Sequence, residues 1–418
     1  MQTLAPVQIN EREIFMDVLR GFAILGIFIA NLGSGFSGYN ESAHLAGPML
    51  LPGLDHKTAF LHHMFIEGKF YSIFSLLFGW GIALQFKRAD AKGFNALPTI
   101  KRRLMFMLLL GAIHLMIWPG DIVFFYALLG FILLPCRKFS NKTLLITGIS
   151  LTLLPIALYA AKSYWQWLNA PAGILFETGQ KVDTLLTGVT SEESYKEFVK
   201  TATWWDIFKG NLAGFFYRYG YLFFVSRIPK VLGMFMIGYA LGRSDFYKNI
   251  AQNKKIIYWV IGIGLLIGLP ANFYLARYMT YFMQDYFDLK TKGLYQTIAY
   301  ALGVAPLAMA YVGLFMLSFQ TTAGKKILSV LAPVGKMAFS NYMMQSFIGN
   351  FFFLNAGLGY SGTMGPVYYT LFGITVFIIQ VIISTIWLKY FNYGPVEWIW
   401  RSATYKKWQP FRKTGSVN

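Results

Sequence analysis

The stretch GAIHLMIWPGDIVFFYALLG, residues 111–130, is apolar enough for a membrane interior and yet contains two ionisable side chains. Its centre, Trp118-Pro119-Gly120, is typical of a tight turn between two helices. The sequence therefore predicts two membrane-buried helices, with His114 near the end of the first and Asp121 at the start of the second. Ionisable groups are costly in hydrocarbon, so their presence there indicates a function.

The composition of the whole chain indicates an integral membrane protein. Of its 418 residues, 56% are hydrophobic, 18% are aromatic and only 13% are charged, about half the charge density of a soluble domain. The net charge of +19 does not predict nucleic-acid binding, because the basic residues lie in short loops between apolar segments. We expect membrane lipids around the protein and no nucleic-acid partner. The single cysteine, Cys136, excludes an internal disulfide and a cysteine-rich metal site, and we expect no bound metal.

About ten apolar segments have the length of a membrane span, which predicts an all-α polytopic bundle. The first is not a cleaved signal peptide, because Asp17 and Arg20 lie in its opening turns and no small-residue cleavage site follows. The predicted spans are 14–36, 59–86, 104–118, 121–136, 143–162, 229–243, 256–276, 294–318, 328–354 and 368–390.

The distribution of Lys and Arg predicts the orientation of these spans. The linkers after the second, fourth, sixth and eighth spans contain most of the basic loop residues, whereas the opposite loops 37–57 and 355–367 contain only Lys57. Basic loops remain in the cytoplasm, so both termini are predicted to be cytoplasmic. The loop 277–293, with three basic residues, fits this pattern less well.

One membrane domain over residues 12–405 and a basic cytoplasmic tail over 406–418 are the simplest division of the chain. The only sizeable region outside the spans is 162–228, predicted to be extracytoplasmic and interfacial. It contains Thr190-Ser191-Glu192-Glu193, which fits a capping box at the start of a short helix. The aromatic stretch 210–230 that follows is predicted to be interfacial or re-entrant, because Arg218 and Arg227 interrupt it.

Several polar residues within spans are candidates for a substrate pocket. Asp17 and Arg20 are three residues apart on one helix face and predict an ion pair, a ligand site, or both. Asn31, four turns further along that face, is equally consistent with a hydrogen bond that packs helices. Glu67 and Lys69 are two residues apart and do not face each other on a helix, so each needs its own partner.

His114 and Asp121 allow two interpretations each. The imidazole of His114 either bonds to a neighbouring helix as a neutral group or acts as a general base. Asp121 either caps the second helix or orients His114, since a base needs a partner that fixes its proton. His44 and His56 lie in the first outer loop and His62 and His63 begin the second span, where solvated or interfacial roles are the default. Walker, GxSxG and HExxH motifs are absent from the sequence.

The chain resembles the YeiB-like family of bacterial membrane proteins, which implies the bacterial cytoplasmic membrane. The resemblance is carried, in order, by MDVLRGFAILGIFIANL (16–32), GKFYSIFSLLFGWGIAL (68–84), residues 111–130, VGKMAFSNYMMQSFIG (334–349) and FNYGPVEWIWRSATY (391–405). The H…GD pattern and GPVEWIWR are the stretches most specific to the family.

That family is in turn similar to transmembrane acyltransferases, including the O-acyltransferases of surface polysaccharides and the lysosomal enzyme that acetylates heparan sulfate. The shared element is D-x-x-R-G, here Asp17 to Gly21. The polysaccharide enzymes have a histidine about fourteen residues after this aspartate, where this chain has Asn31. The heparan enzyme has an asparagine there, then a glycine-rich stretch and a histidine; NLGSGFSGYNESAH (31–44) is similar and nominates His44. We rank His114 first and His44 second.

The resemblance implies transfer of an acyl group from cytoplasmic acyl-coenzyme A, as co-substrate, to a hydroxyl or amine of a small-molecule or glycan acceptor on the other face. The phosphates of coenzyme A require a basic cytoplasmic mouth, for which Arg20, Lys101, Arg102 and Arg103 are the candidates. The alternative is a transporter, in which Asp17, His114 and Asp121 relay protons or bind a solute. A third interpretation is a non-catalytic scaffold. The sequence predicts no oligomeric state.

Overall fold

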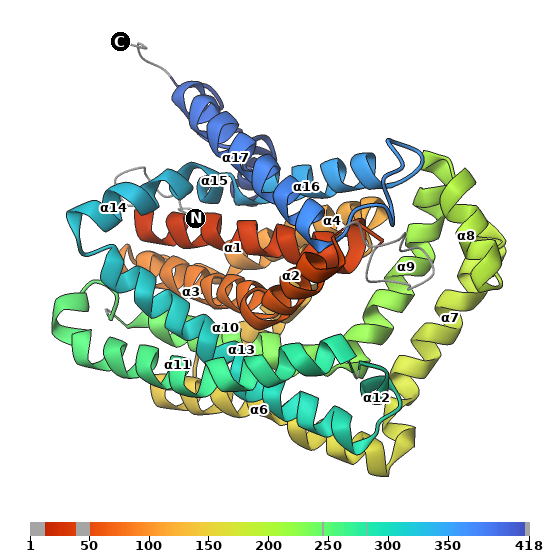
Figure 1. Cartoon of the computed structure of the whole chain (residues 1–418). Helices are drawn as coiled ribbons and strands as arrows, with labels where there is room; N and C mark the ends of the chain where they lie inside the picture. The colour runs from red at the N-terminus through yellow and green to blue at the C-terminus, as the bar shows by residue number, and fades with distance from the viewer. Residues whose placement is uncertain (1–12, 39–50, 245, 282, 414–418) are drawn as a thin grey trace.

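The protein is a bundle of helices, shown in Figure 1 as a computed structural model that describes residues 13–38, 51–244, 246–281 and 283–413. Within these ranges the only β-type pairing is an isolated bridge between Phe391 and Arg412, so the all-α prediction is confirmed. The α-helices are α1 (Ile14–Asn31), α2 (Pro52–Phe65), α3 (Lys69–Ala91), α4 (Leu97–Ile117), α5 (Val123–Cys136), α6 (Asn141–Tyr164), α7 (Ala170–Thr187), α8 (Glu192–Thr201), α9 (Trp204–Phe224), α10 (Arg227–Arg243), α11 (Ile250–Tyr281), α12 (Met283–Phe287), α13 (Thr291–Ser318), α14 (Thr322–Leu328), α15 (Ala332–Lys336), α16 (Ala338–Phe353), α17 (Pro366–Tyr390) and α18 (Pro395–Tyr405). Shorter turns are the π-helix η2 (Leu32–Phe36) and the 3₁₀-helices η3 (Gln166–Asn169) and η4 (Ser329–Leu331).

The ten predicted spans all contain helix, but two of them are divided. Segment 59–86 is interrupted between α2 and α3, and segment 328–354 contains η4, α15 and α16. In the described part of the chain, five helices are long and apolar enough to cross a membrane, or six if the bent pair α9–α10 is one span. The protein is therefore a membrane protein, and the count of about ten spans stays a prediction.

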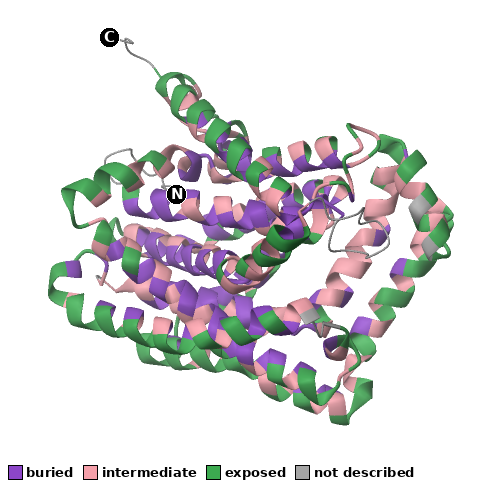
Figure 2. Cartoon of the chain, viewed as in Figure 1, coloured by how far each residue is buried: buried purple, intermediate pink, exposed green. Residues whose placement is uncertain are grey.

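The spanning helices differ in what their apolar side chains contact. In α1, 67% of the most apolar window is buried inside the protein, whereas the value is 28% in α6, 22% in α11 and 28% in α17. Figure 2 shows exposed residues along these outer helices, and those of α17 include Ile378, Ile382 and Ile386. A helix that is apolar on its exposed face is stable in lipid rather than in water, so α1 belongs to the core and α6, α11 and α17 to the lipid boundary.

The region 162–228 forms a helical hairpin in which α7 packs against α9, at the right of Figure 1. The predicted short helix is α8, but its capping box is one residue later than predicted: Ser191 is the N-cap and Ser194 is its reciprocal partner. The stretch 210–230 is helical, and α9 and α10 meet at an angle of 74°. This bend places Arg218 and Arg227 inside the bundle.

Residues 406–413, the first part of the predicted tail, pack on the end of α17 and on α18. The Asn392 backbone N–H donates to the Phe411 carbonyl at 2.9 Å, and the Trp398 indole N–H donates to the Gln409 carbonyl at 2.8 Å. These contacts hold α18 against the end of α17, next to the start of α4.

Candidate functional site

The turn between α4 and α5 positions the two ionisable residues of the opening stretch. Pro119 ends α4, because proline has no backbone N–H to continue the helix. Gly111 lets the start of α5 lie directly against α4, since a Cβ there would overlap the backbone of Phe124. The two helices therefore form a tight hairpin with His114 on one arm and Asp121 at the base of the other.

The end of α4 leaves carbonyl groups without helical partners, and two asparagines from distant helices bind them. Asn211 Nδ2 on α9 donates to the carbonyls of Met116 and Ile117 at 2.8 and 3.0 Å. Asn350 Nδ2 on α16 donates to the Ile117 carbonyl at 2.6 Å. The hairpin is thus fixed from both sides by side chains that the sequence interpretation did not identify.

His114 and Asp121 form a buried pair, and Asp121 also binds a backbone N–H in the first turn of α5, from the position before the N-cap residue Ile122. Asp121 Oδ1 lies 2.7 Å from His114 Nδ1, and Oδ2 accepts a hydrogen bond of 2.7 Å from the backbone N–H of Phe124. The residues are 0% and 1% exposed. A carboxylate that accepts at Nδ1 places the imidazole proton there, so Asp121 fixes the tautomer of His114 while it caps α5.

The other ring nitrogen of His114 is the group on which a reaction would depend. Nε2 is buried and has no hydrogen-bond partner within the described residues. With the proton on Nδ1, Nε2 carries a lone pair and can accept a proton from an acceptor hydroxyl or amine. The ring of Tyr342, on α16, lies 5.1 Å from the imidazole centroid.

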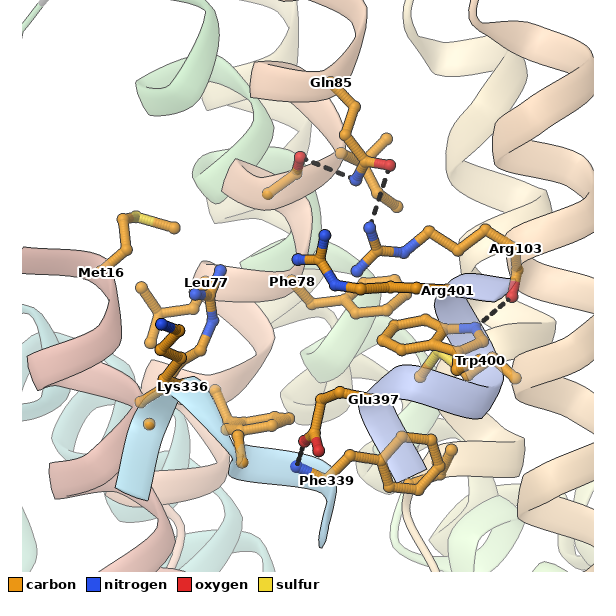
Figure 3. A pocket seen from close by; sticks show the side chains of 18 of the residues that line it. Met16, Leu77, Phe78, Gln85, Arg103, Lys336, Phe339, Glu397, Trp400 and Arg401 are labelled. Atoms are coloured by element: carbon orange, nitrogen blue, oxygen red, sulfur yellow. Dashed lines mark hydrogen bonds between the residues drawn. The ribbon is translucent and has the colours of Figure 1, made fainter. Parts of the chain in front are cut away.

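A cavity of about 230 Å³ lies between α1, α3, α4, α16 and α18 (Figure 3). Among the described residues that line it, five are cationic and two are carboxylates. The cations are Arg20, Arg88, Arg103, Lys336 and Arg401, and the carboxylates are Glu13 and Glu397. The rest of the wall is largely apolar, and it includes Ile122, Val123 and Tyr342, which adjoin the His114–Asp121 pair. His114 itself does not line the cavity.

The cationic wall of the cavity is held by specific contacts. Arg103 Nη1 donates to Gln85 Oε1 at 3.1 Å, and its guanidinium lies 4.1 Å from the centre of the Trp400 ring. Trp400 in turn donates its indole N–H to the Arg103 carbonyl at 2.9 Å. Figure 3 shows Arg103, Arg401 and Lys336 among the side chains that line the cavity.

Glu397 is directed toward a helix rather than toward these cations. Its Oε1 accepts hydrogen bonds from the backbone N–H groups of Phe339 and Ser340, at 2.6 and 3.1 Å, at the N-terminus of α16. The partial positive charge of a helix N-terminus stabilises such a carboxylate. Glu397 is therefore bound to the start of α16.

Two of the four residues predicted to form a basic mouth line this cavity. Asp17 and Arg20 form the expected ion pair at 2.7 Å, and Arg20 and Arg103 both line the cavity. Lys101 is exposed on the outside of α4. Arg102 turns away and donates to the Thr404 carbonyl at 3.0 Å, where it joins α4 to α18. Neighbouring positions on a helix point in different directions, which a cluster of basic residues in the sequence does not indicate.

The other predicted pocket residues lie apart from this cavity. Asn31 is at the end of α1 and lines neither this cavity nor the smaller one described below. Glu67 and Lys69 both bind His63, through different groups: Glu67 Oε2 lies 2.6 Å from His63 Nδ1, and Lys69 Nζ donates to the His63 carbonyl at 2.7 Å. His44 lies outside the described residues.

Several residues of the cavity were missed, although the sequence contained a signal for them. Lys336, Tyr342, Trp400 and Arg401 lie in the stretches 334–349 and 391–405, which carry the family resemblance. All five such stretches contribute side chains to the wall of this one cavity. In the described ranges, no three His, Cys, Asp or Glu side chains gather closely enough to hold a metal ion.

Comparisons with known proteins agree with the sequence resemblance. A family described as "Protein of unknown function (DUF418)" matches residues 241–407. "Uncharacterized protein YxaH" of Bacillus subtilis (strain 168) is 32% identical over 437 aligned positions and covers 100% of both chains. "Uncharacterized protein YeiB" of Escherichia coli (strain K12) is 28% identical, over 94% of this chain and 96% of its own. No solved structure matches the chain significantly.

Proposed function

Since this chain belongs to the DUF418 family of YeiB-like proteins, whose chemistry is not assigned, we propose an activity from its own site. The protein transfers an acyl group from acyl-coenzyme A to a hydroxyl or amine acceptor, and His114 acts as the general base. The observation that carries this proposal is a single cavity with a cationic rim and an apolar interior that extends to the residues around the His114–Asp121 pair.

The cavity suits the three parts of acyl-coenzyme A in order. The phosphates of the nucleotide match Arg103, Arg401 and Lys336 at the opening, since arginine binds phosphate oxygens through paired hydrogen bonds. The pantetheine arm and acyl chain match the apolar wall of Phe74, Phe78 and other large side chains. The thioester then approaches Tyr342 and Ile122, beside the imidazole.

The reaction that follows needs no group beyond this pair. His114 Nε2 removes the proton of the acceptor O–H or N–H, and the acceptor atom attacks the thioester carbonyl carbon. The carbon–sulfur bond breaks, and the coenzyme A sulfur takes the proton from the imidazolium. Asp121, hydrogen-bonded at Nδ1, stabilises the imidazolium between these steps.

Tyr342 separates the cavity from His114 in the conformation described. Its ring packs on the imidazole, and its hydroxyl accepts a hydrogen bond of 3.3 Å from the backbone N–H of Ile122. The transfer therefore requires the Tyr342 side chain to turn aside when the thioester binds. Because coenzyme A is cytoplasmic, we place the cationic rim, both termini and the basic loops on the cytoplasmic side of the bacterial inner membrane.

The first test measures binding and needs no knowledge of the acceptor. Acetyl-coenzyme A should raise the melting temperature of the purified protein in detergent, whereas S-acetylpantetheine, which lacks the phosphates, should bind much more weakly. Arg401→Gln should weaken acetyl-coenzyme A binding about tenfold or more, the usual value of a charge-assisted hydrogen bond. Lys101→Gln removes the same charge from an exposed position and should change nothing. Equal losses in both variants, or no binding by the unaltered protein, would reject the proposal.

A solute transporter is the second candidate, and the broken helix pair α9–α10 is the observation that favours it. Discontinuous helices form the substrate sites of many transporters. Protein in liposomes that moves a solute without any acyl donor would establish this alternative.

A further inference from the structure

A second cavity, of about 40 Å³, lies at the bend between α9 and α10 and shares no lining residue with the first. Its wall comes from α9, α10, α11, α12 and α13 and from the Glu67 turn. It lies where α10 begins, so the helix N-terminus adds partial positive charge there. The volume is enough for a few water molecules or one small anionic group.

Two cations line this second cavity and contact aromatic rings: Lys230 is buried, and Arg227 is partly buried. Arg227 Nη1 donates to the Tyr300 hydroxyl at 3.0 Å, and its guanidinium lies 4.5 Å from the centre of the Tyr71 ring. Lys230 is 8% exposed, and its Nζ lies 4.2 Å from the centre of the Tyr300 ring. Among the described residues, Lys230 Nζ has this ring contact and no hydrogen-bond acceptor. A buried ammonium without an acceptor is costly, which indicates a ligand.

Other polar groups at the second cavity also lack partners. The side-chain oxygen of Gln296 is buried without a hydrogen bond, and the residue is 7% exposed. Arg218, which does not line this cavity, also has a buried Nε without a hydrogen-bond partner in the described ranges and interacts electrostatically with Arg227. The amide of Gln296 can turn its NH₂ group toward a ligand.

The charge balance of the second cavity favours an anion. Glu67 is the only carboxylate among its described lining residues, and it is already bound to the His63 ring at 2.6 Å. Gly68, with φ of +82°, allows the chain to turn sharply between α2 and α3 and directs Glu67 to that histidine. Arg227 and Lys230 thus line the space with more positive charge than Glu67 offsets.

We propose that this second cavity binds a phosphate group, either as free phosphate or as the head group of a membrane phospholipid. A phosphate carries up to two negative charges and several acceptor oxygens, which matches two cations, an amide and a helix N-terminus. The proposal depends on these contacts alone and does not require acyl transfer.

The test compares the unaltered protein with Lys230→Met, which keeps the length of the side chain and removes its charge. Without phosphate the variant should be at least as stable, because it no longer buries a cation without an acceptor. Inorganic phosphate, added against potassium chloride of equal ionic strength, should raise the melting temperature of the unaltered protein only. Gln296→Leu should weaken phosphate binding about tenfold, and Lys290→Gln, which changes an exposed side chain, should have no effect.

A second measurement distinguishes the two sources of phosphate. It also tests the proposal if one of the variants does not fold. Protein from nanodiscs containing phosphatidylglycerol is analysed by native mass spectrometry for a retained phospholipid. Stabilisation by inorganic phosphate identifies free phosphate, whereas a phospholipid retained by the unaltered protein and lost in Gln296→Leu identifies a lipid head group. The proposal is overturned if neither ligand distinguishes the unaltered protein from both cavity variants.

Discussion

Two histidine–carboxylate pairs of almost the same length occur in the described part of the chain, and their surroundings differ. His114 Nδ1 lies 2.7 Å from Asp121, and His63 Nδ1 lies 2.6 Å from Glu67. The side chains of the first pair are fully buried, whereas those of the second are 16% and 35% exposed. Water can screen the charges of His63 and Glu67 and replace their hydrogen bond, but it does not reach His114 and Asp121. Contact length alone therefore does not distinguish the two pairs, whereas the burial of their side chains does.

The two pairs also arise differently from the sequence. His63 and Glu67 are four residues apart, and the turn that directly follows α2 at Phe65 is enough to bring them together. His114 and Asp121 are seven residues apart and meet only because Pro119 and the turn reverse the chain. The contact between His114 and Asp121 therefore depends on tertiary packing, and breaking it should have larger effects on stability and activity than breaking the contact between His63 and Glu67.

The largest contrast is expected in acyl transfer. His114→Gln removes the base while keeping a polar side chain of similar size, and should lower the rate by at least about a hundredfold. His63→Gln makes the same change in the exposed pair and should leave the rate within about threefold. The assay is release of free coenzyme A from acetyl-coenzyme A in the presence of a bacterial envelope extract. If the two variants lose activity equally, the buried pair has no special role.

The next contrast is in stability. Asp121→Ala removes the cap of α5 and leaves His114 Nδ1 buried without an acceptor, which should cost about 2–4 kcal/mol in the free energy of unfolding. Glu67→Ala breaks a partly exposed pair and should cost about 1 kcal/mol or less. Denaturant unfolding in mixed micelles measures both. Asp121→Asn can still cap the helix, so it should recover part of the loss; no recovery would assign the whole effect to His114.

Most of the helices could be predicted from the sequence, because long apolar segments indicate helices that are buried in the protein or in lipid. The sequence did not predict that α2 and α3 are separate helices, since the segment 59–86 is largely apolar and its only acidic or basic residues besides two histidines are Glu67 and Lys69. It identified His114, Asp121, Arg20 and Arg103 of the site. Lys336 and Arg401 are more than three hundred residues from Arg20, and only tertiary structure shows that they share its cavity.

A smaller difference in stability is expected between asparagines that donate to a backbone carbonyl inside the protein and one that does so at its surface. Asn350→Ala removes the 2.6 Å hydrogen bond to the Ile117 carbonyl, but Asn211 still donates to the same oxygen, so the cost should be about 1 kcal/mol. Asn355→Ala removes a similar bond of 2.9 Å to the Lys200 carbonyl at the surface and should have almost no effect. The double variant Asn211→Ala with Asn350→Ala should lose more than the sum of the single changes, because it leaves the buried carbonyl without a donor. Additive losses would show that water reaches the end of α4.

The smallest effect is expected from Tyr342→Phe, which removes only a hydroxyl between the cavity and the buried pair. That hydroxyl accepts a long hydrogen bond of 3.3 Å from Ile122, so the free energy of unfolding should change by about 0.5 kcal/mol or less. The ring that packs on His114 is retained, and acetyl-coenzyme A binding should be unchanged. If the tyrosine only separates thioester from base, the transfer rate should stay within about threefold of the original. A loss as large as that of His114→Gln, with binding and stability intact, would instead make the Tyr342 hydroxyl a reacting group, and the buried pair alone would no longer account for the chemistry.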